Sequence, residues 1–181
     1  MIAAHRYAQA ILDISQQQNA ADKIYRDSID LLNIIKQNRE LYNFLKSPLI
    51  KSDTKERIFR SLFEKNIHTI LIQFVSILCK RRRENILPEI LNAIISEYKK
   101  RNNIVSVQLV TTFKWDEELK KSLTEQLQKL KQASKIELHE NIDESIIGGF
   151  IIKTESEQID TSIKTQLNQL YQKFIQSNSL N

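Results

Sequence analysis

The chain places its only two glycines side by side in the stretch Ile142-Asp143-Glu144-Ser145-Ile146-Ile147-Gly148-Gly149-Phe150-Ile151-Ile152-Lys153, where an apolar strand begins. Glycine weakens a strand, so a pair at this position predicts a β-bulge or the close approach of another backbone. A backbone with positive φ, which glycine adopts at little cost, is the other explanation. Downstream, Ile159-Asp160-Thr161-Ser162 leads into a helical pattern, which is typical of a strand hairpin followed by a capped helix.

The segment upstream of this block changes from strand to helix periodicity and back. Val105, Val107 and Leu109 alternate with polar residues, and a second alternating run surrounds Ile136. Between the two runs, Asp116 is expected to cap a helix that carries leucines along one face. The last helix of the chain is expected to carry Ile163, Leu167, Leu170 and Phe174 on one side, and the helix that bears the last three is expected to pack on the sheet.

The first part of the chain shows helical periodicity almost throughout. Ser52 is expected to cap the fourth helix, and the fifth helix, over residues 67–82, is apolar nearly all round and is expected in the middle of a bundle. The expected core face of the fourth helix is Ile58, Phe59, Leu62 and Phe63. The predicted fold class is therefore α+β, with a six-helix bundle over residues 1–104 and a small β-α-β-β-α domain over 105–181.

Composition supports long helices and a mild positive charge. Two prolines and two glycines are too few for a loop-rich or all-β protein of 181 residues. The formal charge is +5, and basic residues cluster at 80–83 and 99–101. Each cluster ends an expected helix, where cations favour the negative end of the helix dipole. Solvated helix ends are the simpler interpretation, and a nucleic-acid patch remains the alternative.

Groups that could carry catalysis are scattered. His5, His68 and His139 have no spacing that suggests a metal site, and the single cysteine, Cys79, lies in an apolar run and is expected in the core. The glycine pair lacks the Lys-Ser/Thr of a phosphate-binding loop. We therefore expect no catalytic residues, no cofactor and no metal. The chain shows no secretory signal and no apolar run long enough to cross a bilayer, so a soluble intracellular protein is expected.

The glycine block resembles the C-terminal signature of the delta subunit of rotary F-type ATP synthases, a family related to the mitochondrial oligomycin-sensitivity-conferral protein. The residues in register with the family pattern are Asp143, Ile147, Gly148, Gly149, Lys153, Ile159, Asp160, Ser162, Leu167 and Leu170. Further segments match the same family in the same order, namely 6–12, 44–50, 83–89 and 107–112. Three positions depart from the pattern: Thr161 replaces a glycine, Glu155 stands in the expected hairpin turn, and Lys153 replaces an arginine.

The resemblance implies a non-catalytic connector in the stator of the ATP synthase. In the family, the helical domain grips the alpha subunits of the catalytic head, and the C-terminal domain holds the b subunit of the peripheral stalk. Carried over, the head site comprises Tyr7, Ala10, Ile11, Ile14 and Phe74. The stalk site, or its support, comprises Gly148, Gly149, Leu167, Leu170 and Phe174. The alternative that the head-site residues are bundle core stays open for at least half of them.

The same resemblance implies a peripheral location on the cytoplasmic side of the cell membrane, held there by the complex and without direct membrane insertion or nucleic-acid binding. Two other functions remain as alternatives. A helical RNA-binding protein of the antitermination type would use the basic run at 80–83, although the appended glycine-pair domain argues against it. A helical enzyme has no candidate nucleophile or metal cluster.

Overall fold

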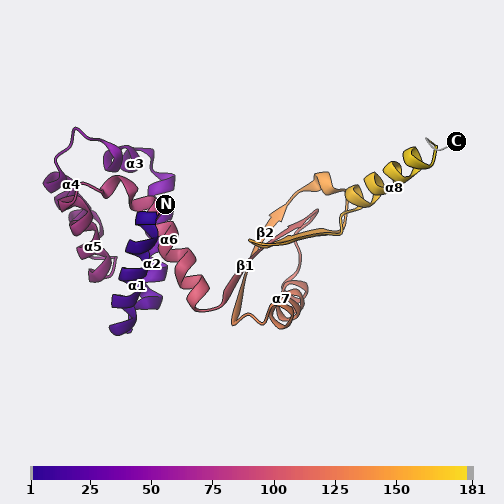
Figure 1. The fold of residues 1–181 in the computed structure, drawn as a ribbon, viewed down its shortest axis with the longest axis horizontal. Helices are drawn as coiled ribbons and strands as arrows, with labels where there is room; N and C mark the ends of the chain where they lie inside the picture. Colours follow the sequence, from indigo (N-terminus) through magenta and orange to yellow (C-terminus); the bar gives the residue numbers. More distant parts are fainter. Residues whose placement is uncertain (1, 179–181) are drawn as a thin grey trace. The chain divides into compact units, whose positions relative to one another are not determined.

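The computed structural model describes residues 2–178, except for the side chains of residue 2 and of several positions near the end of the last helix. It divides into two compact units, the first ending at Arg101 and the second beginning at Asn102. Helices alone build the described part of the first unit, and the second combines helices with a four-stranded sheet (Figure 1). The predicted α+β class is confirmed.

The first unit contains six α-helices and a short 3-10 helix among its described residues. Their bounds are α1 (Ile2–Gln17), α2 (Ala21–Gln37), α3 (Arg39–Lys46), α4 (Ser52–Phe63), α5 (Thr69–Lys80), η1 (Glu84–Ile86) and α6 (Leu87–Arg101). The α6 helix packs along α1 and α2, whereas α4 packs against α5. Ala8, Leu31 and Leu91 are fully buried, and the small side chain of Ala8 lets the neighbours of α1 approach closely.

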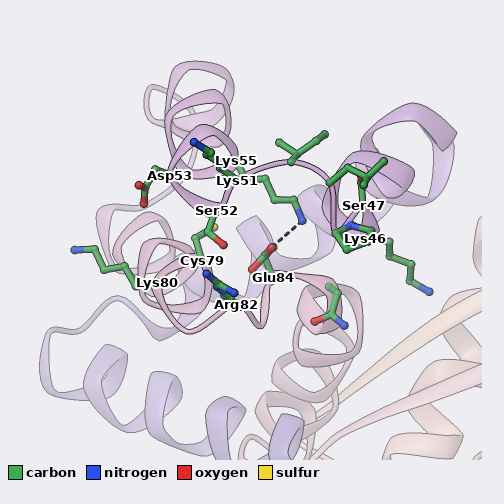
Figure 2. A pocket seen from close by; sticks show the side chains of 14 residues that line it. Lys46, Ser47, Lys51, Ser52, Asp53, Lys55, Cys79, Lys80, Arg82 and Glu84 are labelled. Atoms are coloured by element: carbon green, nitrogen blue, oxygen red, sulfur yellow. Dashed lines mark hydrogen bonds and ion pairs between the residues drawn. The ribbon is translucent and has the colours of Figure 1, made fainter.

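Buried polar side chains tie the helix ends together. The carboxylate of Asp27, in α2, accepts a hydrogen bond from the backbone N–H of His68 at 2.6 Å and so holds the chain where α5 starts. Lys55, in α4, donates to the backbone oxygen of Leu45 at 2.8 Å and pairs with the Glu84 carboxylate at 2.7 Å (Figure 2). Because both members of this ion pair are buried, losing either one would leave an uncompensated charge in the interior.

The start of α4 differs from the prediction. Ser52 is the first residue of the helix, and the capping position belongs to Lys51, which has an extended backbone with φ −61° and ψ 138°. A capping side chain must reach back to the helix amides from such an extended residue, and no side chain caps α4. The expected cap at Ser52 is therefore wrong.

The buried faces of α4 and α5 are narrower than predicted. Phe59 and Phe63 are buried as expected, but Ile58 and Leu62 are exposed. The α4 helix makes its main helix–helix contact with α5, so only one stripe of it is covered. The α5 helix is not buried all round either, because Ile77 lies half exposed on its outer face.

The second unit is a mixed sheet with helices in the connections. Its elements are β1 (Ile104–Thr111), α7 (Glu117–Lys131), β2 (Lys135–Ile142), η2 (Glu144–Ile146), β3 (Phe150–Lys153), β4 (Gln158–Asp160) and α8 (Ile163–Asn178). The strand order is β2-β1-β3-β4. The β1 strand pairs in parallel with β2 across the α7 crossover and antiparallel with β3, which forms a hairpin with β4. The order is β-α-β-β-β-α; the strand expected at Ile159 is present as β4, although the predicted formula counted one strand fewer.

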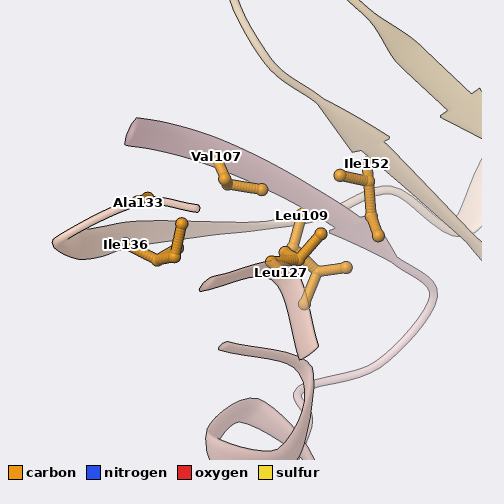
Figure 3. Close-up of a cluster of buried hydrophobic side chains, with 6 residues drawn as sticks. All are labelled: Val107, Leu109, Leu127, Ala133, Ile136 and Ile152. Carbon is orange, nitrogen blue, oxygen red and sulfur yellow. The ribbon is translucent and has the colours of Figure 1, made fainter. Parts of the chain in front are cut away.

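The core of the second unit lies between the sheet and α7. Figure 3 shows the buried side chains that meet there: Val107, Leu109, Leu127, Ala133, Ile136 and Ile152. Strand register explains the cluster, since Leu109 and Ile152 are cross-strand partners and point to the same face. Asp116 caps α7 as predicted, with its carboxylate accepting from the N–H of Leu119 at 2.8 Å.

The last helix does not pack on the sheet as predicted. The α8 helix contacts η2 near its start, and Leu167 and Leu170 remain half exposed. The predicted packing of Phe174 lies outside the described side chains. The apolar face of α8 is thus largely open in the part of the helix whose side chains are described.

Candidate functional site

An apolar surface runs along α1 and α5 in the first unit. Tyr7, Ala10 and Ile14 are spaced three and four residues apart and therefore share one face of α1. The rings of Tyr7 and Phe74 meet edge to face with centroids 5.7 Å apart, which joins this face to α5. The Tyr7 hydroxyl accepts a hydrogen bond from the Arg83 guanidinium at 3.1 Å, so the ring is held at both ends. We call this the α1–α5 surface.

Exposure separates docking residues from core residues on the α1–α5 surface. Ile11 is 2% exposed and belongs to the core of the unit. Ile14 is 48% exposed, Ala10 is exposed, and Tyr7 and Phe74 are half-buried. Of the five predicted head-site residues, the structure therefore leaves four at the surface and places Ile11 beneath them.

Sequence reasoning missed one member of the α1–α5 surface. Ile77 lies three residues after Phe74, on the same face of α5, and is as exposed as Ile14. The spacing of Phe74 and Ile77 can be read from the sequence. A helix expected to be buried on all sides, however, gave no reason to assign Ile77 to a surface. Large aliphatic side chains left open on two neighbouring helices form the kind of surface that binds a partner helix.

The glycine pair in the second unit sits directly before β3. Gly149 has φ +76°, and a Cβ at this position would overlap the backbone oxygen of Thr161. A Cβ on Gly148 would lie 2.7 Å from Cδ1 of Ile163, the flexible end of a side chain. The Gly148 carbonyl accepts the Ile163 N–H at 3.0 Å. The predicted close approach and positive φ are both confirmed at Gly149, and they bring the glycine loop against the start of α8.

Ile147 is strained in a way that the sequence did not reveal. It has φ +69° and ψ −39°, a backbone conformation that is a genuine outlier for a β-branched residue. Its side chain is 61% exposed. Strain of this kind persists only where the surroundings enforce it, and here the hydrogen bond from its N–H to the Glu144 carbonyl closes the turn.

The start of α8 is fixed by a network of short polar side chains. The buried Ser162 hydroxyl accepts the N–H of Thr165 at 3.2 Å and so caps the helix. The Asp160 carboxylate accepts from the Ser162 N–H at 2.9 Å and from the Thr165 hydroxyl at 3.0 Å. These hydrogen bonds, those of Ser162 foremost, hold the pKa of Asp160 below its usual value. The network sets where α8 begins relative to β4.

The departures from the family pattern are accommodated. The Thr161 hydroxyl donates to the Phe150 carbonyl at 2.8 Å, next to the ladder bond from the Thr161 N–H to the same oxygen at 3.0 Å. In the β3–β4 turn the Thr154 N–H donates to the Glu157 carbonyl at 2.8 Å. Threonine in place of glycine therefore adds a contact at the edge of the sheet.

The open face of α8 completes the second candidate surface. Leu167 and Leu170 are each 52% exposed, and Phe174 lies outside the described side chains. Neighbouring positions on the helix are also open and apolar, namely Ile163, Tyr171 and Ile175. We call this the α8 surface. Together with the loop at Gly148 and Gly149 it contains the predicted stalk-site residues whose side chains are described.

Neither a metal site nor a membrane-spanning helix is found among the residues that the structure describes. No three His, Cys, Asp or Glu side chains come together as a possible metal site within the described residues. No helix there is both long enough and apolar enough to span a membrane.

Comparison with known proteins gives matches over nearly the whole chain. The family model described as "ATP synthase delta (OSCP) subunit" matches residues 3–174. The ATP synthase subunit delta of Cytophaga hutchinsonii is 31% identical over 171 residues, which cover 94% of this chain and 93% of that protein. The subunit delta of a Synechococcus species is 32% identical and covers 91% of this chain and 89% of its own.

A solved structure shares the fold. A chain of the Toxoplasma gondii mitochondrial ATP synthase hexamer, solved by cryo-electron microscopy, superposes with a TM-score of 0.74 and covers 95% of this chain and 97% of its own. Its sequence identity is 19%, so this likeness supports the architecture alone. The sequence matches, in contrast, extend from the first helix to the last. The chain therefore belongs to the ATP synthase delta (OSCP) subunit family.

Proposed function

We propose that this protein is the connector that joins the catalytic head of an F-type ATP synthase to its peripheral stalk. Membership in the delta subunit family makes the chain a stator subunit of that enzyme and favours this function over the RNA-binding alternative. The observation that carries the proposal is that each compact unit has its own open apolar helix face. A connector needs two such faces because it must hold two partners at once.

The mechanical task explains why the subunit needs binding surfaces rather than reacting groups. Proton-driven rotation of the rotor exerts a torque on the head, and the head would turn with the rotor unless the stalk held it. The contacts at both ends of the connector must therefore stay bound against this torque throughout each catalytic cycle. Large desolvated apolar contacts supply slow dissociation, which is the property required.

The α1–α5 surface is the proposed site for the head. An amphipathic helix from the N-terminus of an alpha subunit would lay its apolar side between Ile14 and Ala10 of α1 and Phe74 and Ile77 of α5. Ala10 supports this assignment because its small side chain leaves room for a second helix to approach. Tyr7, held by Arg83, contributes an aromatic anchor with one polar end.

The α8 surface is the proposed site for the b subunit of the stalk. Leu167 and Leu170 are spaced three residues apart on the open face of α8, which matches the spacing expected of a helix–helix contact. The glycine loop contributes indirectly, because it contacts the start of α8 through Gly148 and Ile163. The proposal gives Gly148 and Gly149 a supporting role and the leucines the direct contact.

The proposal includes no chemistry within the subunit. Catalysis would belong to the head, and this chain would bind no cofactor and would reach the cytoplasmic side of the membrane only through its partners.

The test of the proposed function is affinity purification of the tagged chain from detergent-solubilised native membranes. Recovery of both alpha and b subunits, with b lost selectively from a Leu167→Asp variant, is the expected result. Recovery of RNA that is released by salt, with neither subunit present, would overturn the proposal.

A further inference from the structure

A hollow of about 680 Å³ lies in the first unit and shares no residue with the α1–α5 surface (Figure 2). It is lined by the end of α3, the loop that follows, the first turn of α4, the end of α5 and η1. Its volume falls in the range of small-molecule sites, roughly 300–1,000 Å³. Neither the family assignment nor the proposed docking contacts assign it a use.

The lining of the hollow is strongly cationic. Five basic side chains and two acidic ones line it, and one of the basic ones, Lys55, is neutralised by Glu84. The remaining cations are Lys46, Lys51, Lys80 and Arg82, all exposed. They come from both sides of the hollow, Lys46 and Lys51 from the α3–α4 segment and Lys80 and Arg82 from the end of α5 and the residues that follow it.

Arg82 occupies a backbone position that glycine would fill at lower cost. It has φ +54°, and its N–H bonds to the Cys79 carbonyl at 2.9 Å while the next N–H, of Arg83, bonds to the Leu78 carbonyl at 2.8 Å. This pattern is the Schellman end of a helix, whose left-handed residue is usually glycine. A cation is thus kept beside the hollow at a small expense of stability, at a kind of helix end where Gln132 adopts the same backbone conformation.

The start of α4 adds unpaired hydrogen-bond donors to the same space. Thr54 and Lys55 direct their N–H groups to the Lys51 carbonyl at 3.0 and 3.1 Å. The earlier amides of Ser52 and Asp53 have no acceptor in the part of the chain that the structure describes, and both residues line the hollow. Free amides at the positive end of a helix dipole favour an anion.

The floor of the hollow holds an acceptor without a donor. Glu84 is 6% exposed, and its Oε1 pairs with Lys55, whereas Oε2 is buried and has no hydrogen-bond partner among the described residues. In Figure 2 the carboxylate lies among the lining side chains. A buried unpaired oxygen is costly, so it favours a ligand that donates an N–H or O–H at this depth.

We propose that the hollow binds a small phosphorylated ligand that also carries a hydroxyl or amine donor. The phosphate charges would lie between Lys51, Lys80 and Arg82, in reach of the free amides of α4. The donor would reach Oε2 of Glu84 below them once the side chains that cover this oxygen move aside. An acidic peptide is the less favoured ligand, because a carboxylate carries one negative charge, whereas a phosphate group carries nearly two and offers three acceptor oxygens to the surrounding cations.

Isothermal titration of the full-length chain with ADP tests the proposal, because ADP carries two phosphates and ribose hydroxyls. Arg82→Gly is the informative variant, since it removes a cation and relieves the left-handed backbone, so the protein should melt no lower than the wild type. We expect it to weaken ADP binding about tenfold, and Lys51→Gln to do likewise. Lys65→Gln, which removes an exposed cation beyond the other end of α4, should leave the affinity unchanged.

Two further probes separate the parts of the site. Inorganic pyrophosphate should bind more weakly than ADP and show the same loss in Arg82→Gly, because it lacks the donor for Glu84. Adenosine, without phosphate, should not bind. Absence of ADP binding, equal affinity in Arg82→Gly and Lys51→Gln, or binding of an acidic peptide in place of both phosphate probes would each overturn the proposal.

Discussion

At the residue scale, positive φ has opposite consequences at neighbouring positions. Gly149, at φ +76°, carries no penalty and allows the Thr161 carbonyl to approach. Ile147, two residues earlier, adopts φ +69° with a branched side chain and is strained. Gly149 lets the loop approach the backbone of the β4–α8 junction closely. The strained Ile147, in contrast, places a large apolar side chain in solvent.

Substituting Gly149 by Val should destabilise the second unit by about 1–3 kcal/mol, because the new Cβ would meet backbone and the φ would become unfavourable. Trp115 is the only tryptophan and its ring packs edge to face on Phe150, so its fluorescence during urea unfolding reports this unit. Gly148→Ala is the matched control and should cost less, since its Cβ meets only the flexible end of Ile163. Equal unfolding midpoints for Gly149→Val and the wild type would contradict the explanation.

The Ala10→Arg variant should weaken binding of the head by several kcal/mol, within the range of about 2–4 seen at interface hot spots. Ala10 is exposed, so the free protein should keep its helical circular dichroism and melting temperature. The loss is expected because the bound helix would trap an unpaired charge. Gln9→Arg adds the same charge on another face of α1 and should bind normally. If both variants bind like the wild type, the α1–α5 surface is not the head site.

At the element scale, capping residues show what sequence reasoning could and could not predict. Asp116 and Ser162 follow extended segments and cap α7 and α8, and both were recognisable from their place before a helical period. Ser52 had the same chemistry but lies one residue inside α4, because the loop after Pro48 delivers Lys51 to the capping position. Residue type predicts that a cap is possible, whereas the path of the loop decides which residue takes it.

The cap of α8 should make the second unit sensitive to acid. The folded pKa of Asp160 is lowered, so its contribution to stability is complete above the unfolded value of about 3.9 and is lost as the pH falls through the lower folded value. Hydrogen bonds from Ser145 likewise lower the pKa of Asp143. The Trp115 unfolding midpoint in urea should therefore fall as the pH drops below about 4.

Asp160→Asn isolates the contribution of one carboxyl to this pH dependence. The variant should be less stable than the wild type at neutral pH and should lose less stability on acidification, because the titrating group is gone. Glu125→Gln removes an exposed carboxyl on α7 and should keep the full acid response. A steeper or unchanged acid response in Asp160→Asn would show that the α8 cap does not titrate as inferred.

At the scale of the whole molecule, the order of elements was predictable and the burial of whole faces was not. Alternation at Val105 to Leu109 and the glycine pair predicted the sheet, because periods of two and 3.6 are local properties of the chain. Whether Leu167 or Ile77 is covered depends on elements distant in sequence, and both proved to be open. Periodicity identifies an apolar face, but a face meant for a partner has the same pattern as one meant for the core.

The two units should be separable, and a fragment of residues 1–101 should fold and bind the head alone. The unit that ends at Arg101 contains the complete helical core, from Ala8 to Leu91 and beyond, whereas Asn103 already bonds to Gln132 and Ser134 of the second unit. The fragment should show the helical circular dichroism of a cooperative domain.

Its affinity for an alpha-subunit N-terminal peptide should equal that of the full chain, and Ala10→Arg should reduce both by the same factor. A binding surface confined to one unit gains nothing from the other unit, so the effects of truncation and substitution on the binding free energy should be additive. A soluble, helical fragment that binds several-fold more weakly than the full chain would mean that the head contact also draws on the second unit. Aggregation of the fragment would mean that the helical core needs that unit in order to fold.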